Sequence, residues 1–129
     1  MTAGKGIQHS EMFPLVNDNA PNPTKFFQIW LNLPAKDKMV EPCFVMHWGE
    51  EIPKVTSEDG KTTITVFAGE LEDKNGLPPP PNSWASDKNN ELAVWHMVLK
   101  PGAQYTLPAA QGGQAINRQV SLEEGVMEL

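Results

Sequence analysis

An all-β fold is the expectation for this chain of 129 residues, and three features of the sequence support it. Twelve prolines, nearly double the usual share, interrupt helices and divide the chain into short segments. Several of these segments alternate their side chains with the period of two that is typical of a β-strand. Asp59-Gly60, between two such segments, is a strong signal for a hairpin turn.

Composition narrows the classes of protein to consider. A net charge of −6, without any run of basic residues, argues against direct binding of nucleic acid or of an anionic membrane. No apolar stretch approaches the roughly 20 residues of a membrane-spanning helix, and no signal-peptide pattern is visible. The single cysteine, Cys43, excludes an internal disulfide. We therefore expect a cytoplasmic protein without a membrane or nucleic-acid partner.

The first predicted strand covers residues 25–33. Phe27, Ile29, Leu31 and Leu33 share one face of this strand, and its other face also carries aromatic residues. Period-two spacing predicts that these four side chains form one buried face.

A second strand is predicted at residues 41–48. His47 is either a metal ligand or a structural residue, and a histidine on so apolar a strand is more often structural. Cys43 is either a reactive nucleophile or an inert buried thiol. No cationic neighbour that would lower the pKa of its thiol is evident, which favours the inert thiol.

The middle of the chain predicts a hairpin at residues 55–68, with its turn at residues 57–60. Strand character returns at residues 91–99 and, briefly, at residues 104–110. Between them, residues 72–90 have the composition of a linker that lacks regular helix or strand. Four consecutive prolines at 78–81 favour polyproline II structure. They suggest either a stiff spacer or, less often, a ligand for an SH3-like or WW-like module.

His9 and Glu11 are the candidate metal ligands. Two residues apart on an extended strand, their side chains project to the same side. An imidazole and a carboxylate are half of the ligand set that suits a divalent, iron-like ion with open positions. Gly4 and Gly6 supply the permissive backbone of a turn before them. The bare spacing is common, and a solvated strand is its ordinary interpretation.

Residues 1–12 resemble the segment that closes the metal site of the N-terminal cupin barrel in pirin-like proteins. Further blocks resemble that family in its own order: residues 27–34, 38–42, 52–53, 66–70 and 99–109. The resemblance implies an incomplete cupin, or double-stranded β-helix. Residues 1–71 would be the C-terminal half of an N-terminal cupin, residues 72–90 a Pro-rich linker and residues 91–129 the start of a C-terminal cupin.

The resemblance also implies a site and a function. His9 would be a metal ligand, and Glu11 both a ligand and the catalytic base, for Fe(II) or another divalent metal. The family's other two ligands belong to a His-x-His motif, which this chain lacks. We therefore expect a truncated or fragmentary chain that holds iron weakly or not at all. With open β-edges and uncovered apolar faces, such a chain is expected either to form a homo-oligomer or to be poorly ordered.

Three hypotheses about function follow from the resemblance. The parent protein is a quercetin 2,3-dioxygenase-type enzyme acting on a flavonol, or it is a non-catalytic, iron-dependent regulatory partner of transcription factors. As a third hypothesis, the chain is a fragment without activity of its own.

Overall fold

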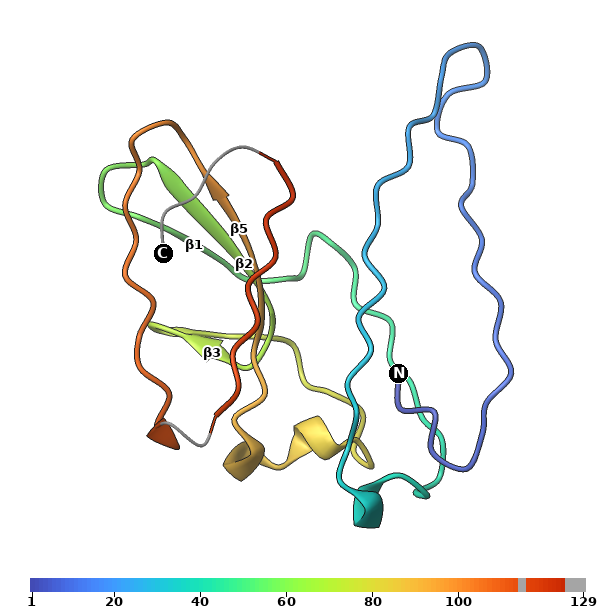
Figure 1. Cartoon of the computed structure of the whole chain (residues 1–129). Coiled ribbons are helices and arrows are strands. Elements are labelled where there is room, and N and C mark those ends of the chain that lie inside the picture. Colours follow the sequence, from blue (N-terminus) through green and yellow to red (C-terminus); the bar gives the residue numbers. More distant parts are fainter. Residues whose placement is uncertain (114–115, 125–129) are drawn as a thin grey trace.

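The computed structural model describes residues 1–113 and 116–124, and these consist mostly of strand and coil (Figure 1). Two small antiparallel sheets and three single-turn 3-10 helices are the regular elements of this part of the chain. No helix among the described residues is long and apolar enough to span a membrane. The expectation of an all-β protein is confirmed to this extent: the described residues are mostly strand and coil, with small antiparallel sheets.

The larger sheet has three strands in the order β1-β2-β5: β1 (Lys54–Thr56), β2 (Thr62–Ala68) and β5 (Val94–Leu99). Both pairs of neighbouring strands are antiparallel, and Ile64 of β2 lies opposite Val55 on one side and Met97 on the other. The predicted hairpin and the predicted strand within residues 91–99 are therefore confirmed.

The hairpin turn explains why this part of the prediction holds. The N–H of Gly60 donates to the carbonyl of Ser57 at 2.8 Å, and Gly60 has φ +67°, which glycine adopts without strain. The hydroxyl of Ser57 accepts from Thr62 N at 2.9 Å and donates to Asp59 Oδ1 at 2.6 Å. The residues of the turn itself thus satisfy its polar groups.

The core lies on one face of this sheet. Its fully or nearly fully buried apolar residues are Val55, Ile64, Val66 and Leu71, with Trp95, Met97 and Tyr105 packed against them. Leu71 comes from the second sheet, a short hairpin of β3 (Glu70–Leu71) and β4 (Lys74–Asn75). Alternate residues of β2 supply the buried side chains, as the period of two requires.

Residues 72–90 are more structured than a linker. They contain β4 and two 3-10 turns, η2 (Trp84–Ser86) and η3 (Lys88–Asn90), which corrects the expectation of no regular structure. The four prolines themselves form no strand, as predicted, because they have no N–H to donate. Pro80 is buried, which does not favour the interpretation as a freely exposed SH3 or WW ligand.

The pairing of β2 with β5 joins residues from both sides of this segment in one sheet. The division of the chain into residues 1–71, 72–90 and 91–129 stays a prediction.

The predicted strand at residues 25–33 is wrong. Residues 6–34, which we call the arm, form two long extended runs joined at a tip, without strand pairing (Figure 1). Of the four side chains expected to be buried there, Phe27, Ile29 and Leu31 are exposed, Ile29 at 67% and Leu31 at 51%, and Leu33 is half-buried. Alternation describes the side chains of an extended segment, but a strand also needs a neighbouring backbone to bond with, and the described residues provide none here.

Two further predicted strands are corrected for the same reason. Within residues 41–48 only Cys43 pairs, in an isolated bridge to Thr2, and residues 104–110 run extended without a ladder. Cys43 is half-buried rather than buried. Between the arm and Cys43 lies the single turn η1 (Ala35–Asp37).

Candidate metal-ligand pair

The base of the arm is closed by backbone bonds between the N-terminus and residues 40–43. Thr2 and Cys43 exchange hydrogen bonds of 2.8 and 3.1 Å, and Lys5 N donates to the carbonyl of Val40 at 3.0 Å. Gly4 makes this approach possible. A Cβ at this position would lie 2.1 Å from the Val40 oxygen, and its φ of +52° also favours glycine. The predicted glycine turn is therefore present, immediately before the candidate ligands.

His9 and Glu11 follow that turn in extended backbone. The prediction that they lie on a strand is wrong, since no ladder includes them. Their side chains nevertheless approach each other, with 3.9 Å between His9 Nε2 and Glu11 Oε1. The two side chains are 44% and 58% exposed. They form an open pair at the surface.

The geometry of this pair suits two positions on one metal ion. Ligand nitrogen and oxygen atoms lie about 2.0–2.2 Å from a bound divalent metal, so two of them on one ion can be up to about 4.4 Å apart. The separation of 3.9 Å lies within that limit. No cluster of three or more histidine, cysteine, aspartate or glutamate side chains occurs in residues 1–113 and 116–124. His9 and Glu11 are thus a pair of candidate ligands, whereas a non-haem iron site needs at least three protein ligands.

A second histidine pairs with a carboxylate elsewhere. His96 on β5 has its Nε2 3.6 Å from Glu123 Oε2, and the other oxygen of Glu123 contacts the ammonium of Lys25. The Glu123 side chain is 25% exposed, less than either partner. Three segments far apart in the sequence meet at this carboxylate. Sequence reasoning missed the cluster because no local spacing connects its members.

Tyr105 and Glu72 form another contact that no motif indicated. The phenol donates to Glu72 Oε1 at 2.7 Å. Burial, followed by this bond and by the charge of Glu72, raises the pKa of Tyr105 to about 12. Both residues line an open depression beside the hairpin turn, together with Thr56, Ser57, Glu58, Asp59 and Gln104.

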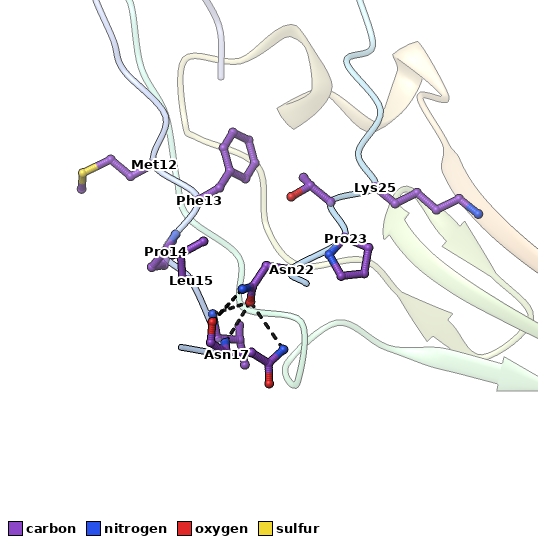
Figure 2. Close-up of a pocket in the computed structure, with 10 residues that line it drawn as sticks. Met12, Phe13, Pro14, Leu15, Asn17, Asn22, Pro23 and Lys25 are labelled. Atoms are coloured by element: carbon purple, nitrogen blue, oxygen red, sulfur yellow. Dashed lines mark hydrogen bonds between the residues drawn. The ribbon is translucent and has the colours of Figure 1, made fainter. Parts of the chain in front are cut away.

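The tip of the arm is held by one asparagine (Figure 2). The Asn22 side-chain oxygen accepts from the backbone N–H groups of Val16 and Asn17 at 2.9 and 2.8 Å, and its amide donates to the Asn17 carbonyl at 2.7 Å. Phe13 and Phe26 pack across the arm with ring centroids 5.6 Å apart. A hollow of about 440 Å³ lies between the two runs at this end. Its lining is about half apolar and half polar, and none of its residues is a histidine, cysteine, aspartate or glutamate.

Comparison with known proteins reveals the relatives of this chain. It is 44% identical over 108 residues to a pirin-like protein of Solanum lycopersicum, an alignment that covers 84% of this chain and 32% of the relative. It is 44% identical over 70 residues to human pirin, covering 54% of this chain and 22% of the relative. The chain is a pirin-family homologue.

A third relative, from Pseudomonas aeruginosa, is named as a proposed quercetin 2,3-dioxygenase. The chain is 30% identical to it over 112 residues, which cover 87% of this chain and 36% of the relative. The chain thus spans between about a fifth and two fifths of the length of the curated relatives it matches. No family model matches the chain, and no solved structure does.

Proposed function

We propose that this chain is part of a pirin-like cupin protein and that His9 and Glu11 supply two ligands of its divalent-metal site, with Fe(II) as the metal. The observation that supports this most directly is the 3.9 Å approach of an imidazole nitrogen and a carboxylate oxygen, directly after a glycine turn. The pirin relatives support the family assignment, and a cupin is the fold that the family implies. In this proposal residues 1–71 and 91–129 belong to successive cupins and residues 72–90 connect them.

The local structure explains how the chain would present the pair. The bonds of Thr2 and Lys5 to residues 40–43 fix the start of the arm, which limits the positions that His9 can take. Ser10 lies between the two proposed ligands, and in extended backbone its side chain points to the opposite side. His9 and Glu11 therefore share one side without the support of a sheet. Their exposure leaves room for further ligands from outside this chain.

For the activity, we propose a quercetin 2,3-dioxygenase-type reaction in the protein that contains this segment, with a flavonol as the substrate. His9 and Glu11 would help to hold a divalent iron, which would supply the open coordination positions that this reaction needs. The Glu11 carboxylate would accept the proton of the flavonol hydroxyl, because it is the only base of the pair that is anionic. His9 would act only as a metal ligand, through its ring nitrogen. The name of the Pseudomonas aeruginosa relative supports this choice of reaction and substrate.

Two ligands bind a metal more weakly than three or four, and exposed ligands lack the outer partners that orient them. We therefore expect the chain by itself to bind Fe(II) weakly and to be inactive towards flavonols.

Anaerobic calorimetric titration of the chain with Fe(II) tests the ligand assignment. His9→Ala and Glu11→Gln should each abolish the weak binding, whereas His47→Ala, a histidine outside the pair, should leave it unchanged. Tight stoichiometric binding that survives His9→Ala, or loss of binding in His47→Ala alone, would contradict the proposal.

A second candidate function is a non-catalytic, iron-dependent regulator. It is supported by the 44% identity over 70 residues to human pirin, because the resemblance to pirins implies this role as well as the enzymatic one. A flavonol turnover assay with added Fe(II), on a longer protein that contains this segment, separates the two. Turnover that is lost in Glu11→Gln supports the enzyme. Metal binding without turnover supports the regulator.

A further inference from the structure

We propose that Ser83 is a positioning residue for the His9–Glu11 pair. Its hydroxyl connects residues 2–5, which lead to the pair, with the Pro-rich segment, residues 77–90. The contact is a hydrogen bond of 3.2 Å from the Thr2 hydroxyl to Ser83 Oγ, between residues 81 positions apart. The role of Ser83 towards a metal rests on the proposed function, whereas the contact with Thr2 does not.

Thr2 is buried at this junction, although the residues on both sides of it are exposed. Only 8% of Thr2 is exposed, against 62% of Met1. The backbone of Thr2 exchanges hydrogen bonds of 2.8 and 3.1 Å with Cys43, and its hydroxyl bonds to Ser83. A buried hydroxyl that loses its partner costs free energy, so the buried position of Thr2 depends on Ser83.

The other contacts of residues 2–5 are weaker. Lys5 and Glu41 form an ion pair, but their side chains are 56% and 68% exposed, and exposed pairs contribute little to stability. The bridge between Thr2 and Cys43 is isolated, and its two backbone bonds do not offset the entropy lost by fixing these residues. The contact with Ser83 therefore adds a bond at the one buried position of this stretch.

The segment that presents Ser83 is held by its own hydrogen bonds. Ser83 N donates to the Pro80 carbonyl at 2.9 Å, and Ser83 Oγ accepts from Ala85 N at 3.3 Å as the cap of η2. The Ser86 hydroxyl donates to the Ser83 carbonyl at 2.7 Å. The prolines before Ser83 have fixed φ angles, and Pro80 is buried. Ser83 thus belongs to a stiff segment and can restrict where Thr2 lies.

The Pro-rich segment also leads into the larger sheet. Figure 1 shows it running from the small sheet of β3 and β4 towards the base of the arm and then back to β5. β5 pairs with β2, whose buried residues belong to the core. Ser83 therefore connects the start of the arm with the packed part of the chain, and His9 follows three residues after Gly6, where the arm begins. A metal site that takes further ligands from elsewhere needs this connection, because its ligands must be placed to within about 0.5 Å.

Hydrogen exchange tests the contact. Thr2→Val and Ser83→Ala each remove one hydroxyl. Each should speed exchange at the Cys43 amide, which bonds to the Thr2 carbonyl, by about fivefold, the equivalent of one hydrogen bond. The double variant should exchange no faster than Ser83→Ala alone, because the same contact is lost in both. Ser121→Ala, at an exposed serine outside the junction, is the matched control and should change nothing. Unchanged exchange in Ser83→Ala, or additive effects of the two substitutions, would overturn the proposal.

Distances between two spin labels test the positioning without any metal. The labels are attached through His9→Cys and Lys61→Cys, the second at an exposed residue of the hairpin, in a chain that also carries Cys43→Ser. The distribution of distances should be broader in Ser83→Ala than with Ser83 present. Ser83→Thr keeps the hydroxyl and should keep the narrower distribution. Equal widths with and without the hydroxyl would refute the positioning role, even where the exchange rates differ.

Titration of a longer protein that contains this segment with Fe(II) separates this proposal from the proposed function. Ser83→Ala should weaken binding by about tenfold, the lower end of the range for residues that orient metal ligands. Binding that is lost in His9→Ala but unchanged in Ser83→Ala would overturn the role of Ser83 alone. Binding that is unchanged in His9→Ala would contradict the proposed function, and the label distances would then decide whether Ser83 holds the arm.

Discussion

Tyr105 donates a hydrogen bond of 2.7 Å to Glu72, and this contact connects the extended segment after β5 to the turn between β3 and β4. Tyr105 also packs against the core formed by Ile64, Val66 and their neighbours. The Tyr105 side chain thus packs against the apolar core, and its hydroxyl bonds to a carboxylate. Its pKa is consequently raised to about 12 by burial first and by Glu72 second.

The raised pKa of Tyr105 predicts a loss of stability at high pH. The unfolded phenol ionises near its ordinary pKa of 10.0, and the folded one near 12. The stabilising contribution is therefore complete below pH 10 and is lost as the pH rises from 10 to 12. Because Tyr105 is the only tyrosine, absorbance of the phenolate reports its pKa directly. Glu72→Gln should lower that pKa towards 10.

Tyr105→Phe provides the control for this prediction. Lysines also titrate near pH 10, so the unfolding free energy of wild type and variant should be compared across the window. Only the difference between the two curves belongs to Tyr105. A phenolate titration centred at pH 10 in the folded wild type would contradict the assignment.

Ile64 at the centre of β2 should contribute more to stability than any exposed apolar residue. It is fully buried and lies between Val55 and Met97. Ile64→Ala should lower the free energy of unfolding by about 2–5 kcal/mol, measured by urea denaturation, because it leaves a cavity in the core. Val120→Ala, at an exposed position, should change it by less than about 0.5 kcal/mol. Equal effects of the two substitutions would show that the core lies elsewhere.

Gly4 should be required for closing the base of the arm. In Gly4→Ala the new Cβ would overlap the Val40 carbonyl, in a backbone conformation that alanine adopts with strain. We expect faster hydrogen exchange at the amides of Lys5 and Cys43, whose bonds depend on this approach, and a loss of about 1 kcal/mol or more. Gly49→Ala meets nothing within 4 Å and should leave the exchange unchanged. Unaltered protection in Gly4→Ala would refute the role.

Ser57 should hold the hairpin turn together. The hydrogen bond from its hydroxyl, followed by that from Lys61 N, lowers the pKa of the Asp59 carboxyl. Ser57→Ala should raise this pKa, as followed by NMR titration, and should cost about 1 kcal/mol through the lost bond to Thr62 N. Since the Asp59 pKa is depressed in the folded state, its contribution is present above the ordinary pKa of 3.8 and is lost as the pH falls. Glu58→Gln, which changes a neighbouring charge only, is the control.

Local patterns in the sequence predicted the parts of the fold whose partners are close by. The hairpin of β1 and β2 was predictable because Ser57, Asp59 and Gly60 determine the turn and thereby the register of the strands beside it. The approach of His9 to Glu11 was also predictable from neighbouring residues, because side chains two positions apart in extended backbone point to the same side. Their role as metal ligands stays a prediction.

The tertiary structure alone decided which extended segments become strands. Residues 25–33 and 94–99 both have strand character in the sequence, yet only the second is a strand, because β2 lies beside it. Likewise, Tyr105 lies 33 positions after Glu72, and Glu123 lies still farther along the chain from Lys25. Side-chain pattern and turn chemistry are properties of neighbouring residues and can be derived from the sequence. A backbone ladder or a long-range contact depends on which distant segment comes to lie alongside, and only the folded chain determines that.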